Sequence, residues 1–281
     1  MLRGAFGSAF RSVACRPGCA DSKTCEARDS CAYARTFEPI LSGARPSGLS
    51  DPPRPFVFRA AHLDGSTIAA DTDFHFDVHL FSAREPNLRY FILAFAQLAR
   101  LGLGPERTPV LLENVEQLDP SGVRLRDLTA ETVDLRPSIL SLDASPEPVN
   151  HVRISFVTPT ELKSGQRLVE RPEFGVLFAR VRDRLATLSA LYGIAPLSLD
   201  FGALGARAEQ VQMIRCELKH VRVSRVSSKT GQRHPLGGFI GEAEYAGALG
   251  EFVPFLRAAQ FTGVGRQTTW GKGEILVTCS M

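Results

Sequence analysis

The order of secondary-structure patterns in the second half of the chain constrains the fold more than any other feature. The patterns are strand, helix, strand, strand, helix and strand, over residues 151–158, 172–192, 211–226, 237–247, 249–259 and 274–279. The order βαββαβ is typical of the ferredoxin-like arrangement, in which two helices cover one face of a four-stranded antiparallel sheet. We therefore predict an α+β fold for this half, with the other sheet face open. A change of register within the third pattern predicts a β-bulge near Lys219 and His220.

A short pattern occurs in both halves of the chain. A helix runs into Gly-x-Gly with an arginine nearby and then into an extended segment, over 91–112 and again over 252–277. Such internal duplication favours tandem ferredoxin-like domains. The proline-containing stretch 141–149 is the expected linker, which gives domains at 1–145 and 146–281. Asn87 is the expected cap of the first repeated helix.

The charge of the chain excludes little by itself. The 33 Lys and Arg residues exceed the 30 Asp and Glu residues by only three, and many proteins with this excess never contact nucleic acid. Most of the cations are arginines, which suits bidentate contacts with phosphates, although a GC-rich genome gives the same bias. No apolar run is long enough to span a bilayer, so we expect no membrane association and a cytoplasmic location.

The segment 263–273 has the composition of a phosphate-binding loop. Its candidate RNA-binding residues are Gly263, Gly265, Arg266, Thr268, Trp270 and Lys272. Glycines let a backbone approach a ligand and expose its N–H groups, cations neutralise phosphates, and an indole stacks on a base. The alternative is a tight connection between a helix and a strand, with the indole buried.

The sequence GVGRQTTWGKGEILV, after a phenylalanine-rich helix, resembles the C-terminal signature of the CRISPR-associated endoribonucleases of the RAMP superfamily. Four further segments resemble the same family: FVTPTELKSG, PEFGVLFARVRDRLATLSALYG, GLGPER and CAYARTFEP. The resemblance implies tandem RAMP domains, which are RRM-like, and cleavage of CRISPR repeat transcripts to give mature guide RNA. The alternative is a non-catalytic RAMP subunit that binds guide RNA in an effector complex. CRISPR repeat RNA and effector subunits are the implied partners.

The chain departs from the family at its start. In RAMP proteins, a helix similar to the one expected over 2–13 normally follows an opening strand, and this sequence has no residues there. Either the start is misassigned or the first domain lacks its opening strand. We expect the latter.

The family's reaction implies metal-independent attack of the RNA 2′-hydroxyl on the adjacent phosphorus. This chemistry needs a general base, a general acid and nearby cations. His220 and His234 are the candidate catalytic residues, because they lie on or near a hairpin rich in cations. The hairpin residues expected to bind RNA are Lys219, Arg222, Arg225 and Arg233. The alternative is that the histidines only contact the RNA backbone and take no part in catalysis.

Two other groups of residues have the chemistry of metal ligands. Cys15, Cys19, Cys25 and Cys31 fall in one short insertion over about 15–31, and such a group suits a structural zinc site or an iron–sulfur cluster. Their spacing is not that of a standard zinc ribbon, so free thiols are the equal alternative. His75 and His79 share one face of a predicted strand, and we interpret them as residues on an exposed sheet face. No cofactor is expected for catalysis.

Overall fold

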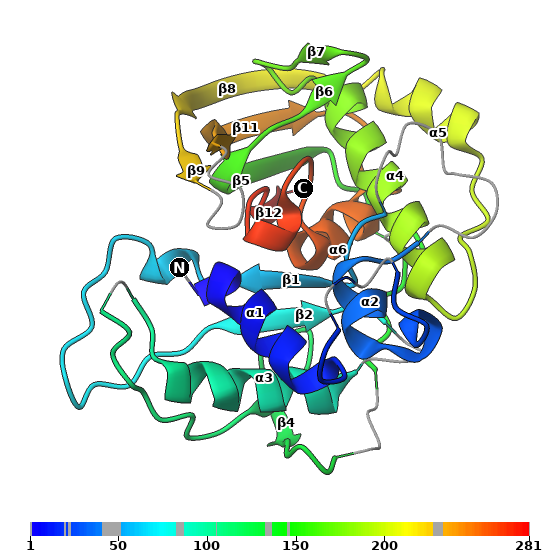
Figure 1. The fold of residues 1–281 in the computed structure, drawn as a ribbon. Coiled ribbons are helices and arrows are strands. Elements are labelled where there is room, and N and C mark those ends of the chain that lie inside the picture. Colours follow the sequence, from blue (N-terminus) through cyan, green and yellow to red (C-terminus); the bar gives the residue numbers. More distant parts are fainter. Residues whose placement is uncertain are drawn as a thin grey trace. The chain divides into compact units, whose positions relative to one another are not determined.

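The computed structural model describes residues 2–19, 21, 24–40, 52–82, 87–104, 106–132, 137–144, 147–226 and 233–280. The chain divides into two compact units (Figure 1). The first comprises Met1–Pro55 and Ser82–Ile139, and the second comprises Phe56–Phe81 and Leu140–Met281. The expected domain boundary at residue 145 lies outside the described residues and stays a prediction. No helix in the described ranges is long and apolar enough to cross a membrane.

A four-stranded antiparallel sheet forms the centre of the second unit. Its strands are β5 (His151–Thr160), β8 (Gln212–Val221), β11 (Gly238–Ala246) and β12 (Ile275–Ser280), and they lie in the order β12-β5-β11-β8. The long helices are α4 (Phe174–Tyr192) and α6 (Val253–Thr262). The long helix α4 lies between β5 and β8 in the chain, and α6 lies between β11 and β12. The order of these six elements is βαββαβ, so the ferredoxin-like prediction is confirmed.

The core of this unit lies between the sheet and its helices. Alternate residues of β5 are buried, as expected for a strand with one apolar face. Aromatic rings fill the layer, and the Phe178 ring of α4 lies edge-on to the Phe252 ring at 4.6 Å. The Tyr245 hydroxyl of β11 donates a hydrogen bond of 2.7 Å to the Pro172 carbonyl, which satisfies its buried polar atom.

Short elements complete the second unit. They are β1 (Phe56–Arg59), η2 (Ala61–Leu63), β2 (Asp77–Leu80), β6 (Lys163–Ser164), β7 (Arg167–Leu168), α5 (Phe201–Ala208), β9 (Ser224–Val226), β10 (Arg233–Pro235) and η3 (Thr268–Trp270). β1 pairs antiparallel with β2 and contacts α6 and η3. The sequence patterns did not predict α5. Its N-cap is Asp200, whose carboxylate accepts a hydrogen bond of 2.9 Å from the Ala203 N–H.

The prediction of a β-bulge near Lys219 and His220 is wrong, because the register of β8 shifts elsewhere. Between β8 and β11 the register shifts where Glu244 pairs with Arg215 and Tyr245 pairs with Met213, so Ile214 is the extra residue. Lys219 and His220 instead continue the regular ladder. β8 ends at Val221, and the chain then forms the separate hairpin β9–β10.

The first unit is built on helices. Its elements are α1 (Leu2–Ala14), η1 (Arg28–Ser30), α2 (Ala32–Phe37), α3 (Leu88–Leu101), β3 (Glu116–Leu118) and β4 (Arg124–Asp127). α1 packs on α3 through aromatic side chains, and the Phe6 and Phe95 rings stack at 4.6 Å. Asn87 occupies the N-cap position of α3, as predicted, but its side chain makes no capping hydrogen bond, and its amide instead donates to the Thr36 hydroxyl at 3.3 Å. Among residues 106–115, which the structure describes, none belongs to a strand.

Candidate nucleic-acid interface

The glycine loop, residues 263–273, connects α6 to β12. Its glycines are required by close approaches within the chain. A Cβ on Gly265 would lie 2.4 Å from the Glu161 carbonyl oxygen, and a Cβ on Gly273 would lie 1.9 Å from the Val264 carbonyl oxygen. Both residues also have positive φ angles, which other residues rarely adopt. The glycines that suggested a phosphate-binding loop are therefore also needed for the packing of the loop itself.

Several N–H groups of the glycine loop bond to the protein itself. The Val264 N–H donates to the Gly273 carbonyl at 2.8 Å, and the Gly273 N–H donates to the Pro159 carbonyl at 3.1 Å. The Arg266 N–H donates to the Glu161 carbonyl at 3.1 Å. The expectation that the loop exposes its N–H groups is wrong for these three, because each already has an acceptor inside the chain.

The side chains of the glycine loop differ in their access to solvent. Arg266 is exposed and forms an ion pair with the largely buried carboxylate of Glu161. Lys272 and Thr268 are buried, at 9% and 4% exposure, and Trp270 is half-buried. Arg266 is therefore the predicted loop cation that a phosphate reaches most directly. Lys272, Thr268 and Trp270 pack within the fold and so support the conformation of the loop.

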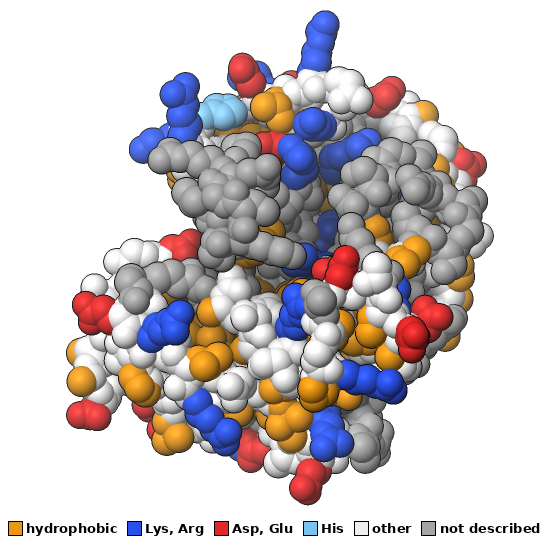
Figure 2. Space-filling view, viewed as in Figure 1, with side chains coloured by type: hydrophobic (Ala, Val, Ile, Leu, Met, Phe, Trp, Pro, Cys, Tyr) orange, Lys and Arg blue, Asp and Glu red, His pale blue; other side chains and the backbone are white. Residues whose placement is uncertain are grey.

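The cationic hairpin lies on the strands that follow α5. Lys219, His220 and Arg222 are exposed on β8 and just after it. The ring of His220 lies edge-on to that of Phe239 at 6.2 Å. His234 pairs with Arg225 across β9–β10, next to the pair of Arg233 with Val226. The structure does not describe the side chains of these paired residues of β9 and β10, so their predicted roles stay predictions. Figure 2 shows Lys and Arg side chains over the β8 side of this unit.

The cysteine insertion places three thiols near one another. Burial raises the pKa of the Cys15 thiol to about 12, and the nearby Cys31 and Cys19 contribute to the rise. All four cysteines of the insertion are free and partly buried. In the described part of the chain, no group of three or more His, Cys, Asp or Glu side chains is arranged to hold a metal. The cysteines as placed thus do not form a ready metal site, and metal binding there stays a prediction.

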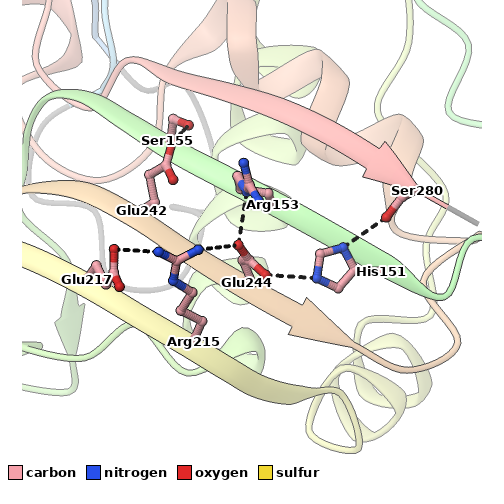
Figure 3. A network of polar contacts seen from close by, with 8 residues as sticks. All are labelled: His151, Arg153, Ser155, Arg215, Glu217, Glu242, Glu244 and Ser280. Atoms are coloured by element: carbon pink, nitrogen blue, oxygen red, sulfur yellow. Dashed lines mark hydrogen bonds and ion pairs between the residues drawn. The ribbon is translucent and has the colours of Figure 1, made fainter.

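The open face of the sheet carries a network of ion pairs (Figure 3). The carboxylate of Glu244 accepts hydrogen bonds from His151 at 3.1 Å, Arg153 at 3.0 Å and Arg215 at 3.2 Å. Arg215 also bonds to Glu217 at 2.8 Å. Burial acts to raise the pKa of Glu244, but the bond from His151 and the charge of Arg153 outweigh it and lower that pKa. These cations therefore have carboxylate partners.

Sequence reasoning missed a second cationic cluster, which we call the α6-end cluster and which consists of Arg59, His79 and Arg184. Arg59 donates from Nη2 to the carbonyls of Gln260 at 2.7 Å and Phe261 at 3.1 Å. His79 Nδ1 bonds to the Phe261 carbonyl at 2.9 Å, and Arg184 Nε donates to the Thr262 carbonyl at 2.9 Å. Three side chains from β1, β2 and α4 thus meet the last carbonyls of α6, immediately before the glycine loop.

The α6-end cluster corrects the interpretation of His79. His75 is exposed, as expected, and its ring stacks on that of His62 at 4.9 Å. His79 is instead partly buried, and burial lowers its pKa, with a smaller contribution from the charge of Arg59. The signal available in the sequence was Arg59 itself, a cation that ends the apolar strand FVFR. An arginine in a buried strand needs acceptors, and here they are helix carbonyls.

The sheet with two helices, followed by a glycine loop, places the second unit in the ferredoxin-like class of α+β folds. Residues 154–275 match the family model described as CRISPR-associated endoribonuclease Cas6, and residues 1–138 match the AF_1859_N model, described as an N-terminal domain. The second unit therefore contains a stretch similar to Cas6 endoribonucleases, in agreement with the resemblance seen in the sequence. No protein with a curated description matches this chain.

One solved structure of a Cas6 protein shares this fold over most of the chain. A Cas6 (TTHB231) product complex aligns over 98% of this chain and 91% of that chain, at 17% identity and a TM-score of 0.55. Another structure, Thermus thermophilus Cas6 (TTHB231), aligns over 47% of this chain and 55% of that chain, at 21% identity and a TM-score of 0.38. A Cas6-related protein from Pyrococcus furiosus aligns over 99% and 88%, at 12% identity and a TM-score of 0.37. The first likeness agrees with the predicted tandem ferredoxin-like class.

Proposed function

We propose that this protein is a cytoplasmic endoribonuclease that cuts CRISPR repeat transcripts to give mature guide RNA. The observation that carries the proposal is the match of residues 154–275 to the Cas6 endoribonuclease family. The proposed substrate is repeat RNA, and subunits of a CRISPR effector complex are the proposed recipients of the product. The proposed cleavage needs no metal ion.

The proposed reaction is an internal transesterification of RNA. The 2′-oxygen forms a bond to the adjacent phosphorus while the bond from phosphorus to the 5′-oxygen breaks. A general base accepts the proton of the 2′-hydroxyl, and a general acid gives a proton to the departing 5′-oxygen. The products are a 2′,3′-cyclic phosphate and a 5′-hydroxyl. Cations beside the phosphate stabilise the negative charge that develops on its oxygens.

The cationic hairpin supplies groups for each of these roles. His220 is exposed beside Lys219 and Arg222, so a phosphate held by these cations lies within reach of an imidazole. We assign acid and base roles to His220 and His234. The remaining proposed RNA contacts of the hairpin are Arg225 and Arg233.

The glycine loop supplies a further contact for the RNA backbone. Arg266 is exposed and already holds the Glu161 carboxylate, and a phosphate oxygen offers a guanidinium the same kind of acceptor. We propose that Arg266 exchanges its carboxylate partner for an RNA phosphate. Gly263, Gly265, Thr268, Trp270 and Lys272 support this contact by fixing the shape of the loop.

Cleavage of repeat RNA in EDTA tests the proposal. Under single-turnover conditions the parental protein should cut, and His220→Ala or His234→Ala should cut about a hundred to ten thousand times more slowly, as expected for loss of an acid or base. RNA affinity should change by less than about tenfold, because one backbone contact is lost. His75→Ala, an exposed histidine outside the hairpin, is the matched control and should cut at the parental rate.

Two results would contradict parts of the proposal. If both hairpin variants cut at the parental rate, the catalytic groups lie elsewhere. If the parental protein binds repeat RNA tightly and does not cut it, the chain is a non-catalytic subunit that holds guide RNA.

A further inference from the structure

A pocket of about 440 Å³ lies in the second unit, beside the first two turns of α4. Three segments form it: the hairpin β6–β7, the start of α4 and the residues that follow α5 (Figure 1). Its volume falls within the range of roughly 300–1,000 Å³ that is typical of small-molecule sites. None of the residues to which RNA contacts or acid and base roles are assigned above lines this pocket.

One wall of the pocket is apolar. Its apolar side chains are Phe174, Val176, Ala179 and Val211. The first and the last of these belong to the core of the unit, so packing holds this wall in place. Gly175 lies within the wall, and a Cβ there would come 3.1 Å from the Cγ atom of Glu209. A glycine at this position therefore leaves room for the Glu209 side chain against the start of α4.

The polar groups of the pocket carry charges of both signs. They include two cations and two carboxylates, so their formal charges sum to zero: Lys163, Arg180, Glu173 and Glu209. Arg180 pairs with Asp183 at 3.2 Å. The other three form no ion pair and no side-chain hydrogen bond with any residue that the structure describes. Opposite charges thus line one pocket without pairing across it, and their donors and acceptors remain open to a ligand.

The hairpin β6–β7 adds a cation next to the pocket. Arg167 is exposed and pairs across the hairpin with Ser164, which lines the pocket. Within the described ranges, Arg167 has no carboxylate partner. Figure 2 shows Lys and Arg side chains at the top of this unit, where Figure 1 draws β6 and β7. A phosphate can therefore bind Arg167 and Lys163 without displacing a carboxylate.

We propose that this pocket binds one unpaired nucleotide of RNA, with the base inside and the phosphate beside Arg167 and Lys163. An apolar wall suits the face of a base, and donors and acceptors of zero net charge suit its edge, which is how proteins recognise single-stranded RNA. Carboxylates accept hydrogen bonds from exocyclic amino groups, so cytosine should bind better than uracil, which has none. The assignment to RNA rests on the proposed function.

Cytidine 5′-monophosphate and uridine 5′-monophosphate are the probes for the pocket. We would measure the melting temperature of the parental protein, Ala179→Leu and Ala190→Leu at increasing concentrations of each. Ala179→Leu fills the pocket without a change of charge, and Ala190 is an exposed residue of α4 outside the pocket, so it is the matched control. At ten times its dissociation constant, the cytidine nucleotide should increase the folding constant of the parental protein and the control about elevenfold.

The filled pocket and the second nucleotide give the decisive comparisons. Ala179→Leu should not respond to the cytidine nucleotide, and the parental protein should need more of the uridine nucleotide for the same response. A parental protein that responds to neither nucleotide, or an Ala179→Leu variant that responds in full, overturns the proposal. If Ala179→Leu does not fold, Glu173→Gln with Glu209→Gln removes both carboxylates, and an unchanged preference for cytidine in that folded variant also overturns it.

Binding of repeat RNA decides whether RNA is the occupant. Ala179→Leu should bind repeat RNA about tenfold more weakly or worse, because one base loses its site, whereas Ala190→Leu should bind as the parental protein does. A lost response to the cytidine nucleotide with unchanged RNA affinity shows that the pocket takes a free nucleotide, which overturns the assignment to RNA. If the parental protein binds no RNA, the proposed function fails, whereas the nucleotide response still decides whether the pocket is a nucleotide site.

Discussion

The open sheet face and the α6-end cluster both contain two arginines and a histidine, but they use them differently. On the sheet, Arg153, Arg215 and His151 surround the Glu244 carboxylate, so positive and negative charges alternate across the strands. At the end of α6, the arginines bond to main-chain carbonyls and have each other's charge nearby. The comparison teaches that a count of cations does not locate an anion site. The surroundings decide which acceptor a cation finds, a carboxylate on the sheet and main-chain carbonyls at the end of the helix.

The largest expected effect concerns the sheet face. Glu244→Gln removes the carboxylate that three cationic side chains share, so the sheet face becomes a group of like charges. We expect this substitution to lower the melting temperature by several degrees. Glu217→Gln, which removes a more exposed carboxylate with one arginine partner, is the control and should change it less. Equal effects of the two substitutions would mean that Glu244 is no more central than an ordinary surface carboxylate.

The stability of the protein should depend on pH through His79 of the α6-end cluster. The pKa of His79 is lowered in the folded protein below its ordinary value of 6.5. The neutral ring therefore contributes to stability above pH 6.5, and this contribution is lost as the pH falls through the pKa of the folded state. The folding constant should fall at most about tenfold for each pH unit from this group. His79→Asn keeps a donor for the Phe261 carbonyl and should abolish this part of the pH dependence. Unchanged dependence in that variant would show that His79 is not responsible.

Glu244 titrates in a lower range, which separates it from His79. Its pKa is lowered below the ordinary value of 4.5, so its contribution to stability is present above that value and is lost as the pH falls through the folded pKa. Unfolding by acid below pH 4.5 should therefore be less steep in Glu244→Gln. The parental steepness in this variant would assign acid unfolding to other carboxylates.

The smallest expected effect concerns the glycine loop. Arg266→Ala should lower the slope of log RNA affinity against log salt by about one unit or less, because one phosphate contact is lost. Lys272→Ala should change the slope less, since Lys272 is buried. Glu161→Gln should raise RNA affinity, because the carboxylate no longer competes for Arg266. Weaker RNA binding by Glu161→Gln would show instead that Glu161 positions the arginine.

Patterns close together in the sequence predicted the second unit well. The alternation of buried residues in β5 and the helical spacing of α4 depend on neighbouring residues, so the sequence contains them directly. The bulge was misplaced because register depends on partner strands, and Ile214 is displaced by the pairing of Tyr245. The short helix α5 was missed although Asp200 precedes it as a cap.

The sites depend on contacts between distant parts of the chain. Arg59 and Gln260 are 201 residues apart in the sequence, and Arg184 and Thr262 are 78 residues apart. No periodic pattern connects such pairs, so the α6-end cluster could not be predicted. The same holds for Arg266 and Glu161, which are 105 residues apart. The glycine loop was found from its composition, but its bonding to the rest of the unit was not.

If the glycine loop binds RNA as proposed, the hydrogen bonds of its backbone N–H groups have a consequence for the kinetics of association. Because the N–H groups of Val264, Arg266 and Gly273 already have acceptors within the protein, the backbone of the loop is ordered before an RNA arrives. In the association proposed above, a side chain such as Arg266 changes partner, which is a fast rotamer motion, and the main chain needs no slow ordering. The loop is a preorganised surface, so the entropy of ordering its backbone is already lost when the protein folds.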